Sequence, residues 1–206
     1  KEFRAVMVVR PNTVDELTGN LDFLRGAGVK MVDLSLDLWT EWTPADALRL
    51  STSLGEAAAY WRAHLPEFGV NWFNEKLARA AGIQELNETA RCGFGAGEIA
   101  VAPSGNLYPC ERLIGDDAAD SSTRLAGHAL AGGDFLDYSP SAARSASPCS
   151  NCSIQTQCGT ACRCSNYVRT GDVSRPDGLL CLLDKVCHRE TLRAFADKPQ
   201  LAHENN

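Results

Sequence analysis

The distribution of cysteine constrains this chain more than any other feature of its sequence. The 206 residues contain nine cysteines, and none of them precedes Cys92. An odd number of cysteines at short spacings fits metal ligation better than a framework of paired disulfides. The chain is acidic, with a formal net charge of −6, and no secretory leader is visible after Lys1. We therefore expect thiolates in a reducing, cytoplasmic compartment, with disulfides as the alternative.

The cysteines form an ordered array. In chain order it consists of Cys92, Gly105 and Cys110, then a C-x2-C-x5-C-x3-C run of Cys149, Cys152, Cys158 and Cys162, and finally Cys181, with Cys164 and Cys187 left over. Thiolates close together in a loop can share a metal centre, and a distant cysteine can complete the ligand shell. Because soft thiolate sites suit both zinc and iron–sulfur clusters, the C-x2-C-x5-C-x3-C run alone predicts a metal without naming it.

Alternating strands and helices are predicted for the first 82 residues. Residues 3–9 and 30–38 have the apolar or alternating character of strands. Helices are predicted after each strand, one beginning with a capping box at Thr13 and the other at Thr43-Pro44. This β-α-β-α order with short connections is typical of a parallel α/β sheet or barrel. Two strands are too few for such a sheet, so we expect either partner strands from a missing upstream part or docking of this unit on something else.

A second domain is predicted over residues 83–206. The pattern indicates a β-hairpin of residues 98–102 and 107–110 around a turn containing Gly105, where positive φ is expected. A mostly loop segment follows over 115–148, and a final helix over 179–196. A shorter helix over 72–81 closes the first domain, residues 1–82.

The complete cysteine order resembles the SPASM domain of radical S-adenosylmethionine (SAM) enzymes. All seven cysteine positions of that pattern are matched between residues 92 and 181. The preceding strand–helix–strand–helix unit looks like the last two βα units of a radical SAM partial barrel. The resemblance implies an α/β partial-barrel fragment (βαβα) followed by a small, loop-rich α+β domain with cysteine ligands and a β-hairpin. It also implies the auxiliary cluster-binding region of an enzyme that modifies a peptide or protein substrate.

The same resemblance implies two auxiliary 4Fe-4S clusters. Carried over by position, the ligands of the first would be Cys92, Cys110 and Cys162, and those of the second would be Cys149, Cys152, Cys158 and Cys181. Some members of the family have a further cysteine where this chain has Glu98. The fourth ligand of the first cluster therefore stays open among Cys164, Cys187, Glu98 and an open iron site.

The motif of radical chemistry itself, C-x3-C-x2-C, is absent from the sequence. We expect that the chain as given does not cleave SAM, and that SAM binds only where the missing N-terminal radical SAM portion is present as a partner. Whether the chain by itself is an enzyme is therefore left open. Two alternatives remain: a zinc-binding structural or interaction module, and a degenerate SPASM protein that recognises a peptide.

Several polar residues are candidates for site roles. In sulfatase-maturing members of the family an Asp acts as a base where this chain has Glu111, so the resemblance implies a catalytic role for Glu111. Asp33, Ser35 and Asp37 share one face of the second predicted strand, where barrel active sites collect functional groups; we assign Asp37 to catalysis and Asp33 and Ser35 to cofactor binding. The acidic composition argues against nucleic-acid binding, and the short apolar stretches against a membrane span.

Overall fold

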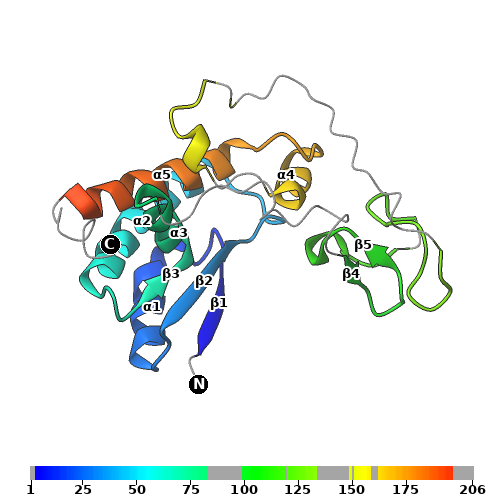
Figure 1. Cartoon of the computed structure of the whole chain (residues 1–206), viewed down its shortest axis with the longest axis horizontal. Helices are drawn as coiled ribbons and strands as arrows, with labels where there is room; N and C mark the ends of the chain where they lie inside the picture. Colours follow the sequence, from blue (N-terminus) through cyan, green and yellow to red (C-terminus); the bar gives the residue numbers. More distant parts are fainter. Residues whose placement is uncertain are drawn as a thin grey trace. The chain divides into compact units, whose positions relative to one another are not determined.

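The computed structural model of the chain describes residues 3–82, 99–118, 120–133, 149, 151–158 and 162–196 (Figure 1). It divides into two compact units. The first comprises Lys1–Leu86, Ser153–Cys158 and Gly178–Asn206, and the second comprises Asn87–Cys152 and Gly159–Asp177. The final helix, predicted within the cysteine-rich domain, thus groups with the N-terminal unit. No helix in the described ranges is long and apolar enough to cross a membrane.

A parallel sheet lies at the centre of the first unit. Its order is β1 (Arg4–Val9), β2 (Met31–Leu36) and β3 (Gly69–Val70). The first two strands match the predicted segments and pair in parallel, as predicted, and β2 also pairs in parallel with β3. The sequence did not predict β3, because two residues are too few to display an alternating pattern.

The two faces of this sheet differ sharply. Val32, Leu34 and Leu36 are buried on one face, as the alternation in β2 predicts. The register pairs Val6 with Asp33 and Val8 with Ser35, so these four residues share the other face. Val6 is 76% exposed and Val8 53% exposed, which is unusual for valines of a parallel strand.

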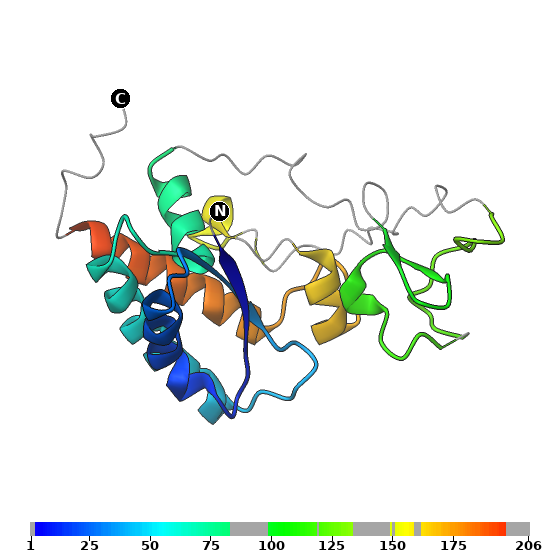
Figure 2. The ribbon, with the colours of Figure 1, turned by 90° about the horizontal axis from the view of Figure 1, so that it is seen from below.

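Helices cover the buried face. α1 (Leu17–Gly26) and α2 (Pro44–Ala63) lie on the same side of the sheet in both views (Figure 2), and α5 (Gly178–Ala196) packs across α2 and α3 (Asn71–Ala80). The core between them includes Trp61, which is fully buried and whose ring lies 5.3 Å from that of Phe73. α5 confirms the helix that the sequence predicts over residues 179–196.

The predicted capping of the two N-terminal helices is confirmed for α2 and not for α1. Thr43 caps α2 as predicted: its hydroxyl accepts from the Asp46 N–H at 3.2 Å, and Asp46 accepts from the Thr43 N–H at 3.0 Å. The capping box predicted at Thr13 is wrong. A 3-10 turn, η1 (Val14–Glu16), precedes α1, and the Thr13 side chain makes no cap.

The second unit contains the predicted hairpin, β4 (Ala100–Val101) and β5 (Leu107–Tyr108), paired antiparallel. Gly105 in its turn has φ +94°, and a Cβ there would come within 2.4 Å of the His128 ring, so only glycine fits. The 3-10 turn η3 (Glu111–Leu113) follows, and α4 (Arg163–Thr170) packs against it. The sequence did not predict α4.

Candidate metal centres

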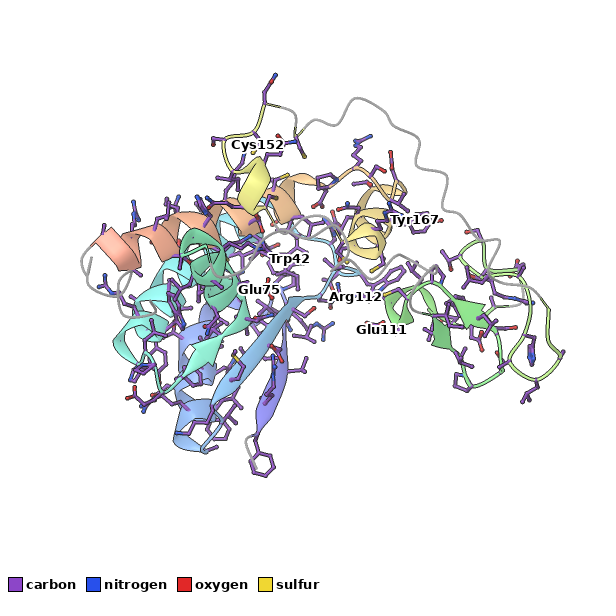
Figure 3. The ribbon with its side chains drawn as sticks, viewed as in Figure 1. Trp42, Glu75, Glu111, Arg112, Cys152 and Tyr167 are labelled. Atoms are coloured by element: carbon purple, nitrogen blue, oxygen red, sulfur yellow. The ribbon has the colours of Figure 1, made fainter. Side chains whose placement is uncertain are left out.

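Three thiols gather where η3 contacts α4 in the second unit. Cys110 immediately precedes η3, and Cys162 and Cys164 lie at the start of α4. The sulfur atoms of Cys162 and Cys164 are 3.2 Å apart, and Cys164 is also hydrogen-bonded to Cys110. Cys164 is buried with Leu113, and Cys110 and Cys162 pack against that pair. Figure 3 shows Glu111 and Arg112 on η3 and Tyr167 on the facing helix.

Hydrogen bonds favour the thiolate forms of Cys162 and Cys110, and the same bonds raise the pKa of Cys164, which donates to both. The Cys164 thiol, as donor, together with the Ser165 hydroxyl at 3.1 Å, lowers the pKa of Cys162 to about 5. Arg112 adds positive charge nearby, and its Nη1 donates to the Ser165 hydroxyl at 2.8 Å. The hydrogen bond with Cys164 likewise lowers the pKa of Cys110. The thiolate is the metal-binding form of cysteine, so the lowered pKa values of Cys162 and Cys110 are compatible with ligation of a soft cation.

The remaining cysteines of the array divide between the two units. Cys149 and Cys152 share one turn of the second unit, closed by the Cys152 N–H donating to the Cys149 carbonyl at 3.0 Å. Cys158 follows the 3-10 turn η4 (Gln155–Gln157) in the first unit, and Cys181 lies in the first turn of α5 in the same unit. Cys92 lies outside the described residues, as does Glu98.

The donor set fits a thiolate-bound metal or cluster. None of the eight cysteines that the structure describes is in a disulfide. Within the same ranges, no group of three or more His, Cys, Asp or Glu side chains is arranged so that it could hold a metal ion. The pairwise contacts among Cys110, Cys162 and Cys164 are thus a gathering of thiols and not a complete coordination shell.

Cys187 belongs to the first unit, whereas these three thiols belong to the second. It is fully buried in α5, and burial raises the pKa of its thiol. Of the candidates for the fourth ligand of the first cluster, Cys164 is therefore the one that lies in contact with two assigned cysteines.

Glu111 lies directly beside Cys110, one of the three gathered thiols. It is exposed, and its Oε2 accepts a hydrogen bond from the Cys110 thiol at 3.3 Å. A carboxylate in this position is accessible to a substrate that approaches Cys110.

The carboxylates of β2 and of the loop after it are held by ion pairs. Asp33 accepts two hydrogen bonds from the Arg4 guanidinium, at 2.7 and 3.0 Å, on the uncovered face that also carries Ser35. Asp37 accepts from the Thr40 hydroxyl at 2.6 Å, from two backbone N–H groups and from Arg10. The Thr40 hydroxyl is the main reason that the pKa of Asp37 is lowered. Asp37 therefore organises the loop after β2.

Comparisons with known proteins support the fold. Neither a family model nor a curated protein matches the sequence. A solved structure of histidine-tagged "anSMEcpe with bound AdoMet", a radical SAM enzyme, is similar with a TM-score of 0.63 at 16% sequence identity. The match covers 100% of this chain and 56% of that one, so the chain spans about half the length of its structural neighbour. At this identity the likeness shows a shared fold.

Proposed function

We propose that this chain is the auxiliary iron–sulfur cluster region of a radical SAM enzyme that modifies a peptide or protein. The observation that carries the proposal is the gathering of Cys110 and Cys162, which the resemblance assigns to one cluster although they are 52 positions apart in the chain. The fold shared with a radical SAM enzyme supports the same assignment. The S-adenosylmethionine of that neighbour would bind here only with a portion that supplies the C-x3-C-x2-C motif.

Two centres are proposed, each with its own ligands. The first takes Cys110 and Cys162, with Cys92 and with Cys164 as the fourth sulfur. The second takes Cys149, Cys152, Cys158 and Cys181. When bound, such clusters supply electron transfer or an anchoring point for a substrate group.

The protein's own side chains have separate tasks in this proposal. Arg112 and Ser165 stabilise the Cys162 thiolate before a metal arrives, through the two hydrogen bonds described above. Glu111 would accept a proton from a substrate held beside Cys110. Asp33, with Ser35, would face bound SAM from the uncovered side of the sheet, and Asp37 would hold the adjoining loop.

Anaerobic reconstitution with iron and sulfide tests the proposal. Two four-iron clusters predict about eight irons and about eight sulfides per chain. The matched control is a Cys110→Ala/Cys162→Ala variant, which should retain about four irons because only the first centre is removed. A colourless protein with stoichiometric zinc would instead favour the zinc module, and a metal-free folded protein would favour peptide recognition alone. The proposal also places the protein in a reducing compartment such as the cytoplasm.

A further inference from the structure

A buried ion pair links two helices of the first unit. Lys76 of α3 is only 4% exposed, and its Nζ lies 2.5 Å from Oδ1 of Asp184 on α5. Glu75, labelled in Figure 3, marks the turn of α3 that carries Lys76. Buried charges lose their hydration, so such a pair adds little net stability. A role in fixing the relative position of the two helices explains it better.

The Lys76 ammonium has a second partner in the same unit. It donates to the backbone carbonyl of Gln157 at 3.0 Å, and Arg79, one turn further along α3, donates to the same oxygen at 3.0 Å. Two cations thus converge on one carbonyl. That carbonyl belongs to the peptide bond that joins Gln157 to Cys158.

The ion-pair partner of Lys76 also lies close to a proposed ligand. Asp184 follows Cys181 by three residues in α5, and residues three apart share one face of a helix. One ammonium group therefore ties the backbone beside Cys158 to the helix face that carries Cys181. These contacts all lie within the first unit.

We propose that Lys76 is a positioning residue that delivers Cys158 and Cys181 to one and the same metal centre. The inference rests on the proposed function, because it concerns the ligands of the second cluster. Segment 153–158 would otherwise lose conformational entropy when metal binds, and a tether formed beforehand removes part of that cost.

The test compares metal content in variants of the full chain after anaerobic reconstitution. Lys76→Met removes both contacts and should lower the iron content from about eight to about four per chain. Lys76→Arg keeps a cation that can donate to both partners, and should restore most of the iron. Lys185→Met is the matched control, because Lys185 is exposed beside Asp184; it should bind iron like the wild type.

A double variant separates positioning from folding. Lys76→Met/Asp184→Leu replaces the ion pair with apolar side chains, which often preserves stability, but it still lacks a donor to the Gln157 carbonyl at position 76. We expect a wild-type circular dichroism melt together with a loss of about half the iron. A folded double variant with full iron and an unchanged cluster spectrum would overturn the inference.

The two proposals fail in different ways. If the wild type binds zinc in place of iron, the proposed function fails, and the same variants still decide the inference through the number of zinc ions bound. Loss of metal in Lys76→Met, with recovery in Lys76→Arg, then supports positioning. Equal metal content in all variants refutes it.

Discussion

Replacing Cys164 with alanine tests whether this buried thiol is the fourth ligand of the first cluster. Its sulfur lies 3.2 Å from that of Cys162 and hydrogen-bonds to Cys110, so it is one of four sulfurs proposed for that centre. Without it, one iron of the cluster has no protein sulfur. Such an iron is the first to leave on mild oxidation, so we expect a loss of about one iron in eight.

The effect of Cys164→Ala on folding should be small, so that a change in iron content does not result from unfolding. Only one sulfur atom is removed from contact with Leu113, which costs about 1 kcal/mol through the lost packing and the small cavity. The circular dichroism melt of the metal-free variant should therefore stay close to that of the wild type.

The assay counts iron and sulfide before and after brief exposure to a mild oxidant, with electron paramagnetic resonance to detect a three-iron product. Cys187→Ala is the control, because Cys187 is equally buried but is assigned to no centre. The reasoning is refuted if Cys164→Ala keeps all its iron after oxidation, as the wild type does. Loss of iron in Cys187→Ala alone would move the fourth ligand to α5.

Two further predictions concern the stability of helix α2 and of the β4–β5 hairpin. Thr43→Ala removes the hydroxyl that accepts from the Asp46 N–H, and should lower the free energy of unfolding by about 1 kcal/mol in denaturant titrations; an unchanged midpoint would contradict the capping role. The Asp117 carboxylate accepts hydrogen bonds from Asn106 and from Tyr108. These bonds and one with the Ser104 side chain, which has the largest effect, lower the pKa of Asp117 to about 2. Its ionised form thus stabilises the hairpin above the ordinary pKa of about 4, and this contribution is lost as the pH falls through about 2. Thermal melts should show Asp117→Asn approaching the wild type in that window, whereas a constant difference would argue against it.

The cysteines of the candidate site could be named from the sequence because their spacing is recognisable, and their role as ligands stays a prediction. The resemblance to the SPASM domain implied a shared centre for Cys110 and Cys162, and both pack against the same buried pair in the structure. Cys164 could be named only as one of several candidates, because its choice depends on packing against Leu113. Arg112 was not predicted at all: its contact with Ser165 joins residues 53 positions apart, and an arginine beside a cysteine has no distinctive local pattern.

Local chemistry in the sequence determined the elements themselves. The alternation of apolar residues predicted β2, the Thr43–Asp46 segment predicted where α2 begins, and Gly105 predicted a turn with positive φ. Each of these depends on residues within a few positions of one another. Local signals can also mislead, as at Thr13, where the chain forms a 3-10 turn despite a sequence suited to a cap.

Only the tertiary structure decided which elements belong together. It grouped α5 with the N-terminal sheet unit, and it buried Lys76 between Asp184 and the Gln157 carbonyl. The physical reason is that a buried charge is stable only where distant partners meet it, and no local pattern records those partners. The sequence by itself determined which thiols are spaced for a metal, and the fold decided which charged side chains lie beside them.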